Sequence, residues 1–337
     1  MLNFFFSFAV LGMIAAGGLF YWGGQQYIAE GPLERSRKVL VPKGAGLAEI
    51  AQNLSRANVI SSPLMFRASV MLQKKQGAMK HGEYLFDEGV TMREVVDKLV
   101  EGKAVVYNVT LPEGLTSQQI VEVLRKNDVL VGDIETVPDE GLLLPNTYSF
   151  GRGTTRQQVI DRMAAAQENA LKRIWQSRVA ELPIKSPEEL VTLASIVEKE
   201  TGQADERSRV ASVFINRLNR GMKLQSDPTI IYGLFGGAGK PKDRPIYKSD
   251  IRKPTPYNTY VIDALPPGPI TNPGLAAMEA VANPSQTSDL YFVADGSGGH
   301  AFAQTLDDHN KNVRRWRKIE ADLKAAKAKK EAEAGSN

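Results

Sequence analysis

Two sequence blocks occur twice in the first half of the chain, and this repeat constrains the fold more than any other feature. Residues 39–54 (VLVPKGAGLAEIAQNL) align with residues 109–124 (VTLPEGLTSQQIVEVL), and residues 84–99 (YLFDEGVTMREVVDKL) align with residues 148–163 (YSFGRGTTRQQVIDRM). Because both copies keep the two blocks in the same order, the pattern indicates duplication of one supersecondary unit. Each copy is predicted to run strand, turn, helix, variable middle, strand, turn and helix.

Local patterns predict further features. Thr91 and Thr155 each precede a helix of the second block and are expected to be N-caps without a chemical role. The Gly-rich residues 233–243 lack the Gly-Lys-Ser/Thr end of a phosphate loop, so we expect a mobile surface loop. Residues 290–302 predict a strand with a hairpin return, and the charged sequence from Asn312 onward predicts a solvated helix.

The stretch 186–232 begins with a well-marked helix. Ser186 suits the N-cap, Pro187 suits the first helical position, and Glu189 lies three residues after the cap. Apolar residues then recur at helical spacing, namely Leu190, Leu193, Ala194 and Val197. Gly202 provides a natural end to this helix.

A second helix is predicted from just after Asp205 to Gly221. The segment 225–229 (QSDPT) that follows is expected to be a polar turn. The reason is that Pro228 disfavours helical backbone at the preceding residue, Asp227.

Two acids at the end of the first helix differ in their position relative to its apolar face. At about 100° per residue, Glu200 falls ~50° from the mean apolar direction and Glu198 ~110° from it. We therefore expect Glu200 at the edge of the buried side and Glu198 toward solvent. A carboxyl against apolar surface at a helix C-terminus has a raised pKa, as a general acid requires. The alternative is that both acids are solvated and have no special role.

Five motifs carry a resemblance to a known family. They are LASIVEKETG (193–202), ASVFINRLNRGMKLQSDPTIIYG (211–233), TPYNTY (255–260), LPPGPITNPG (265–274) and LYFVADGSGGHAF (290–302). Through them the chain resembles the endolytic murein transglycosylases of the YceG-like (MltG) family. The resemblance extends over nearly the whole chain, to His309 and Asn310, and is clearest over residues 190–302. In that family the catalytic acid is the second Glu of the EKET motif, which is Glu200 here.

The resemblance implies a lytic transglycosylase, a carbon–oxygen lyase that cleaves the bond between N-acetylmuramic acid and N-acetylglucosamine inside nascent peptidoglycan strands. Protonated Glu200 would donate to the glycosidic oxygen. Its carboxylate would then accept the proton of the muramic acid's own C6 hydroxyl as a 1,6-anhydro ring closes, ending strand elongation. One carboxylate suffices because the nucleophile belongs to the substrate and is already well oriented, whereas hydrolases use two carboxylates.

The family motifs also contain polar side chains of suitable type to bind a sugar. These candidate substrate-binding residues are Gln225, Asp227, Thr229, Tyr232, Tyr257 and Asn258. Structural roles stay open for some of them: Asp227 also suits an N-cap or Asx turn, and Tyr257, like Tyr260, suits a hydrophobic core. Arg217 on the second helix has an ion pair with an acid as its simplest role.

We expect an α+β fold: an N-terminal transmembrane helix, two small LysM-like α+β repeat units, and a mainly helical, lysozyme-like catalytic domain with short strands. The LysM comparison comes from the family resemblance. LysM modules bind glycans that contain N-acetylglucosamine, but copies this divergent also suit a packing role. The expected divisions are 1–29 (transmembrane helix), 30–38 (linker), 39–108 (LysM-like module), 109–163 (second repeat unit), 164–313 (catalytic domain) and 314–337 (charged C-terminal helix or tail).

The N-terminal residues 1–29 contain no Asp, Glu, Lys, Arg or His. Residues 2–22 are almost wholly apolar, and about 20 apolar helical residues span the hydrocarbon core of a bilayer. Tyr21 and Trp22 at the distal end suit a membrane interface. The pattern predicts a single membrane-spanning helix. A cleaved signal peptide is the alternative, although no basic residue precedes the apolar run.

The charges around this segment conflict with the location that the resemblance implies. Arg35, Arg37 and Lys38 follow the apolar run, so the positive-inside rule alone would leave the body of the protein in the cytoplasm. The resemblance implies a single-pass protein of the inner membrane with its body in the periplasm. We follow the resemblance, because long domains translocate largely regardless of flanking charge.

Composition excludes several other classes of function. The absence of cysteine excludes disulfides and thiolate sites, and His81, His300 and His309 lack metal-ligand spacing, so neither a metal nor a cofactor is predicted. A net charge of +4 with scattered basic residues argues against nucleic acid. The expected partners are peptidoglycan glycan strands, inner-membrane lipid and, by resemblance, the cell-wall synthesis complex.

Two other functions stay open from the sequence. A hydrolytic muramidase needs a second carboxylate to activate water, and Asp227 is the nearby candidate. A non-catalytic peptidoglycan-binding scaffold would keep its binding and its cellular role in a Glu200→Gln variant.

Overall fold

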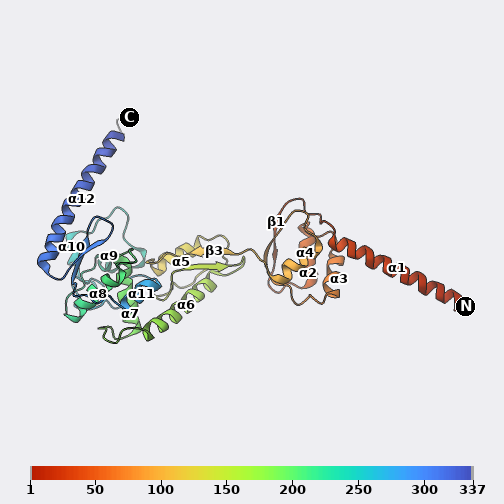
Figure 1. Ribbon diagram of the computed structural model, residues 1–337, viewed down its shortest axis with the longest axis horizontal. Coiled ribbons are helices and arrows are strands. Elements are labelled where there is room, and N and C mark those ends of the chain that lie inside the picture. The colour runs from red at the N-terminus through yellow and green to blue at the C-terminus, as the bar shows by residue number, and fades with distance from the viewer. Residues whose placement is uncertain (1, 335–337) are drawn as a thin grey trace. The chain divides into compact units, whose positions relative to one another are not determined.

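The computed structural model describes residues 2–334; within this range the side chains of residues 2–5, 8, 9 and 327–334 are not described. The described residues form a mixed α+β structure, as predicted, and divide into two compact units. The first unit runs to Asn108 and includes the segments 129–131 and 149–154, and the second contains the remaining residues (Figure 1).

The first unit packs its helices and a two-stranded sheet around one core. Its strands pair antiparallel with Val39 opposite Tyr84, and Tyr84, Phe86 and Phe66 are fully buried there. The elements are α1 (Leu2–Ile28), β1 (Arg37–Val41), α2 (Leu47–Arg56), α3 (Pro63–Leu72), β2 (Gly82–Phe86) and α4 (Met92–Glu101).

The second copy of the repeat follows the same plan. It contains β3 (Tyr107–Thr110), α5 (Ser117–Arg125), β4 (Thr147–Phe150) and α6 (Arg156–Gln176), and β3 pairs with β4. Both copies thus run strand, helix, strand, helix as predicted, and the first adds α3. Thr91 and Thr155 are N-caps, as predicted. Each also completes a capping box, because the side chain three residues later accepts a hydrogen bond from the N–H of the cap residue. The LysM-like character of the two copies stays a prediction.

The second unit is mainly helical. Its core is centred on α7, whose residues 190–197 are buried on nearly every side, and α11 packs against both α7 and α8. The second unit also contains an antiparallel two-stranded hairpin, in which Phe292 lies opposite Phe302. Beyond α5 and α6 its elements are α7 (Pro187–Glu200), α8 (Arg207–Asn219), α9 (Asp227–Phe235), α10 (Lys248–Ile251), α11 (Leu275–Ala282), β5 (Tyr291–Ala294), β6 (His300–Ala303) and α12 (Leu306–Ala334).

The start of α7 is as predicted. The Ser186 hydroxyl accepts a hydrogen bond from the N–H of Glu189 at 3.3 Å, and Pro187 occupies the first turn. The helix ends at Glu200, with Thr201 as its C-cap. The helix thus ends two residues before Gly202, the end expected from the sequence.

Two expectations for the following segments are wrong. The polar turn expected over residues 225–229 is instead the start of α9, with Ser226 as N-cap and Pro228 in the first turn. Proline is tolerated there because the first-turn N–H groups have no partner within the helix. The Gly-rich residues 233–243 were expected to be a loop throughout, but the first three continue α9 to Phe235 and residues 236–238 form a 3₁₀ turn. The Thr116 hydroxyl donates to the carbonyl of Gly237 at 2.6 Å, and the mobility of the segment stays a prediction.

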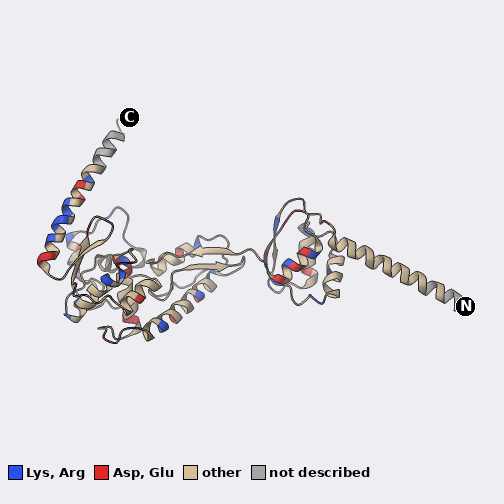
Figure 2. Ribbon diagram, viewed as in Figure 1, with Lys and Arg blue, Asp and Glu red and all other residues tan. Residues whose placement is uncertain are grey.

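The chain's two end helices differ sharply in charge. The N-terminal apolar run forms α1, which carries no Lys, Arg, Asp or Glu, whereas α12 carries both basic and acidic residues (Figure 2). Over the described residues, however, no helix combines the length and the apolar character needed to cross a membrane. The predicted membrane span is therefore not confirmed; Met1, with which it begins, lies outside the described residues.

Candidate active site

Glu200, the last residue of α7, lines a cavity of about 450 Å³ in the second unit. Side chains from α8, the segment between α8 and α9, α9 itself, the segment before α11, the hairpin and α12 form the other walls. The polar and aromatic side chains of these walls include Arg217, Gln225, Asp227, Tyr260, Tyr291 and His309.

The Glu200 carboxyl is partly buried and has a raised pKa. Burial is the main cause, because it disfavours the charged form, and the nearby carboxylate of Asp227 acts in the same direction. The Ser226 hydroxyl donates to Oε1 of Glu200 at 2.5 Å and lowers the pKa, but less than burial raises it. The position and the direction of the pKa shift agree with the expectation from the helix geometry.

A buried hydroxyl network holds Ser226 in place. The Ser226 N–H donates to the Thr259 hydroxyl at 2.9 Å, and the Thr229 hydroxyl donates to the Ser226 carbonyl at 2.6 Å. The hydroxyls of Thr229 and Thr259 lie 2.9 Å apart, and both residues are fully buried. Thr229, one of the candidate substrate-binding residues, therefore supports the residue that contacts Glu200 and does not itself line the cavity.

Gln225 and Asp227 are the two candidate substrate-binding residues that line the same cavity as Glu200. Gln225 has a left-handed backbone with φ +51°, which is uncommon for a residue with a side chain. The hydroxyl of Tyr260 donates to Oδ1 of Asp227 at 2.7 Å. Burial and this hydrogen bond raise the pKa of Tyr260, so its phenol stays protonated.

The other three candidates lie elsewhere in the second unit. Asn258 is buried and donates to the carbonyls of Ile251 and Lys253, so it stabilises a loop. Tyr232 and Tyr257 pack edge to face with ring centres 4.8 Å apart. Tyr232 lines a separate cavity of about 380 Å³.

The expectation that Glu198 faces solvent is wrong. Its Oε2 accepts a hydrogen bond of 3.0 Å from the N–H of Gly274, the N-cap of α11, and burial raises its pKa. The helix wheel locates the acid relative to α7 alone. It cannot include α11, whose N-terminus offers free N–H groups and a positive dipole end to a carboxylate.

Arg217 has no acidic partner, contrary to the role considered from the sequence. Its Nε donates to the carbonyl of Leu290 and its Nη1 to that of Leu224, each at 2.7 Å. No carboxylate lies within ion-pair distance of it in the part of the chain that the structure describes. Burial lowers the pKa of the guanidinium, which is 8% exposed.

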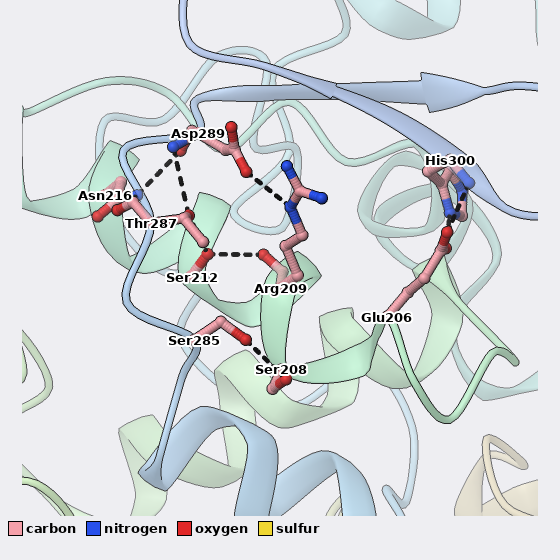
Figure 3. Close-up of polar contacts among 9 residues, drawn as sticks. All are labelled: Glu206, Ser208, Arg209, Ser212, Asn216, Ser285, Thr287, Asp289 and His300. Atoms are coloured by element: carbon pink, nitrogen blue, oxygen red, sulfur yellow. Dashed lines mark hydrogen bonds and ion pairs between the residues drawn. The ribbon is translucent and has the colours of Figure 1, made fainter.

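The Leu290 carbonyl is positioned by polar contacts between α8 and the segment that leads into β5. Figure 3 shows these contacts, which run the length of the helix. They are Ser208 with Ser285, Ser212 with Thr287, Asn216 with the carbonyls of Thr287 and Asp289, and Arg209 with the Asp289 carboxylate, all at 2.8–2.9 Å. Because this segment is fixed along α8, β5 begins at the edge of the cavity.

Two histidines of the second unit have different surroundings. Nδ1 of His300 lies 2.7 Å from the Glu206 carboxylate (Figure 3). His309 stacks on Tyr291 with ring centres 5.1 Å apart, and its buried Nδ1 has no hydrogen-bond partner among the residues that the structure describes. Burial and the charge of Arg217 lower the pKa of His309, which favours the neutral ring. In the described residues no group of three or more His, Cys, Asp or Glu side chains is arranged to hold a metal ion.

Sequence reasoning assigned no role to Ser226, Tyr291 or His309. Ser226 lies inside the QSDPT segment, between two residues that were selected. The cavity walls formed by Tyr291 and His309 depend on the placement of the hairpin and α12, for which the local sequence carries no signal. All three lie in or beside the family motifs, and this was the one available indication.

Comparisons with known proteins identify relatives over most of this chain. A model of the YceG-like family matches residues 39–315. A protein of Bacillus subtilis (strain 168) named endolytic murein transglycosylase is 33% identical, over 88% of this chain and 89% of that protein. A protein of the same name from Streptococcus pneumoniae is 30% identical over 92% of this chain, which spans 64% of that protein's length. The crystal structure of a putative yceG-like protein from Listeria monocytogenes also matches, with 29% sequence identity and a TM-score of 0.48. The match covers 82% of this chain and 99% of the Listeria chain.

Proposed function

This chain belongs to the YceG-like family, and we propose that it is an endolytic murein transglycosylase. It cleaves the bond between N-acetylmuramic acid and N-acetylglucosamine within a glycan strand and leaves a 1,6-anhydro end. The observation that carries this proposal is the carboxyl of Glu200. It lines a cavity, its pKa is raised, and the Ser226 hydroxyl donates a hydrogen bond to it from a fixed position.

Glu200 acts first as a general acid. Its raised pKa keeps a larger fraction of the carboxyl protonated at neutral pH. The proton goes to the glycosidic oxygen as the bond from the muramyl anomeric carbon to that oxygen breaks, and the N-acetylglucosamine leaves with a free hydroxyl. Positive charge develops on the anomeric carbon and its ring oxygen, as in other glycosidic cleavages.

The same carboxyl acts next as a general base. Glu200, now ionised, accepts the proton of the muramic acid's C6 hydroxyl as that oxygen bonds to the anomeric carbon. The ring closes without water, and Glu200 returns to its protonated state. The Ser226 hydroxyl donates to Oε1, so it favours the ionised form between the two steps and holds the carboxyl in one orientation.

Gln225 and Asp227 are the candidates for holding the distorted sugar. Both line the cavity and are exposed. Tyr260 holds Oδ1 of Asp227, so the second oxygen of that carboxylate can accept from a sugar hydroxyl. The other four candidates do not line this cavity, namely Thr229, Tyr232, Tyr257 and Asn258.

A muramidase is the second candidate, because Asp227 lines the same cavity as Glu200. Cleavage in ¹⁸O-labelled water separates the two reactions. A transglycosylase gives unlabelled anhydro ends, whereas a muramidase gives reducing ends that carry the label. Labelled reducing ends as the main product would replace the proposal with hydrolysis.

The cellular setting is also a proposal. We place the activity on nascent strands at the periplasmic face of the inner membrane, near the wall-synthesis complex, with residues 1–29 attaching the chain to the membrane. The uncharged sequence of this segment supports the attachment. Fractionation tests it: the full chain is expected with membranes and a chain lacking residues 1–29 in the soluble fraction. Equal distribution of the two would contradict it.

A further inference from the structure

The positive charge of Arg217 is not neutralised within the described residues. Its Nε and Nη1 donate to main-chain carbonyls, which are neutral. A buried charge is costly unless it is paired, and Arg217 is 8% exposed. Arg209, two turns earlier on the same helix, is by contrast paired with the Asp289 carboxylate at 2.8 Å (Figure 3).

Arg217 is one of the residues that line the Glu200 cavity. Arg217 and Glu200 line the same space, and Nη2 of Arg217 makes no hydrogen bond to any residue that the structure describes. The Tyr291 ring centre lies 5.4 Å from Cζ of Arg217 and covers one face of the guanidinium. The carbonyls of Leu224 and Leu290 hold the other nitrogens, so the group has a fixed orientation.

The acids that share this cavity form no ion pair with Arg217. Glu200 is hydrogen-bonded to the Ser226 hydroxyl; the charge of Arg217 lowers the pKa of its carboxyl, but burial raises that pKa by more. Asp227 receives its hydrogen bond from the Tyr260 hydroxyl and forms no ion pair with Arg217. His309, the basic neighbour, has a lowered pKa that favours the neutral ring, and neither form of the ring carries a negative charge. Among the described residues, the cavity therefore contains a fixed cation that no carboxylate pairs with.

We propose that Arg217 binds a carboxylate of the substrate beside the bond that Glu200 protonates. This inference rests on the proposed function. A guanidinium pairs with a carboxylate through charge-assisted hydrogen bonds of defined direction, whereas sugar hydroxyls and acetamido groups carry no charge. Peptidoglycan offers carboxylates in two places: the lactyl group of a muramic acid without a peptide stem, and the acidic residues of a stem.

Such an ion pair also separates the charges during the reaction. With Arg217 occupied by the substrate, the Glu200 carboxylate that forms after proton donation has no competing pairing with the guanidinium. It remains free to accept the proton of the C6 hydroxyl. Arg217 is thus a specificity-determining residue that also leaves the base available.

Binding to the Glu200→Gln protein tests the proposal without turnover. Stem-free strands are compared with the same strands after their lactyl carboxyl is converted to an amide, and stem-bearing strands with their own amidated form. The amide keeps the carbonyl and removes the charge. We expect one carboxylate form to bind about tenfold to hundredfold more tightly than its amide. The strand pair that shows the difference identifies the source of the carboxylate.

Arg217→Gln in the same background is expected to abolish this difference, and Arg217→Lys to keep part of it, because lysine keeps the charge without the planar fork. Arg220→Gln is the matched control, since Arg220 is an exposed cation at the C-cap of α8, and it should leave the difference intact. Equal binding of both carboxylate forms and their amides by the Glu200→Gln protein would overturn the proposal without the need for any Arg217 variant. An equal loss of affinity for all four kinds of glycan strand in Arg217→Gln would overturn it as well. Anhydro ends from the parent protein on these strands test the proposed function separately.

Discussion

The Ser226 hydroxyl lies 2.5 Å from Oε1 of Glu200 and donates a hydrogen bond to it. This contact joins the N-cap of α9 to the last residue of α7. Ser226 is almost fully buried and is held through its own N–H and carbonyl. The contact therefore combines a rigid donor with an acid whose pKa is raised by burial, and it stabilises the ionised form that the second step requires.

Ser226→Ala is expected to change the pH dependence of cleavage. A general acid must be protonated, so kcat/KM falls as pH rises through the pKa of Glu200. The Ser226 hydrogen bond lowers that pKa, so its loss moves the falling limb to higher pH. The maximal rate is expected to drop about tenfold because the carboxyl loses its fixed orientation.

The pH–rate profile of purified protein on glycan strands measures both effects. Ser249→Ala, at an exposed position of α10, is the control and should match the parent. A profile of Ser226→Ala that coincides with that of the parent would contradict the role assigned to this contact.

Glu200→Gln is expected to stabilise the fold more at high pH than at low pH. The folded pKa of Glu200 is raised above its unfolded value, which is about 4.3. Between these two values the folded chain binds more protons than the unfolded chain, so stability falls as pH rises through that window. Glutamine does not titrate, and the variant lacks this loss.

Denaturant unfolding at pH 4 and pH 8 checks this sign. The free energy of unfolding of Glu200→Gln, relative to the parent, should increase from pH 4 to pH 8. Glu181→Gln removes an exposed carboxyl and is the control. A relative stability of Glu200→Gln that decreases over the same range would show that burial does not dominate at this site.

Asp227→Asn is expected to reduce cleavage by about tenfold while the products stay anhydro. The substitution keeps an oxygen acceptor for the Tyr260 hydroxyl and a polar group in the cavity, and it removes one charge-assisted contact to the sugar. If Asp227 instead activated water, the loss would be at least a hundredfold. Rates and product ends from one digestion distinguish the two roles.

Asn272→Ala is expected to lower the free energy of unfolding by about 3 kcal/mol. Asn272 is fully buried, and its Oδ1 accepts from the N–H groups of Gly141 and Leu143, each at 3.0 Å. Its Nδ2 donates to the Ser117 hydroxyl at 3.0 Å. Alanine leaves these buried groups without partners. Chemical denaturation measures the change, and Asn219→Ala, at an exposed position, should lie within about 0.5 kcal/mol of the parent. A similar value for Asn272→Ala would contradict this account.

The sequence predicted what depends on neighbouring residues. The Ser186 cap and the apolar spacing after it located α7, and Gly202 indicated its end to within two residues of Glu200. The repeated blocks and the Thr91 and Thr155 caps defined the strand–helix pairs of the first half. These signals are local, so they are readable without knowledge of the packing.

The sequence could not predict what depends on distant partners. Glu198 turned toward α11 because the N-terminus of that helix supplies a free N–H. Thr229 was selected by residue type, but its hydroxyl is turned into the network around Ser226. Arg217 bonds to the carbonyl of Leu290, 73 residues away, where an acid had been considered. Each outcome is decided by which segments meet in the fold.

The most direct test of the account compares the ends that the parent, Glu200→Gln and Glu198→Gln proteins generate on purified glycan strands, read by mass spectrometry. Glu198→Gln is the matched control, because it removes a partly buried carboxyl two residues away and keeps an oxygen to accept the Gly274 N–H. The account predicts anhydromuramyl ends from the parent and from Glu198→Gln, and a loss of at least a hundredfold in Glu200→Gln. Undiminished anhydro ends from Glu200→Gln would contradict it.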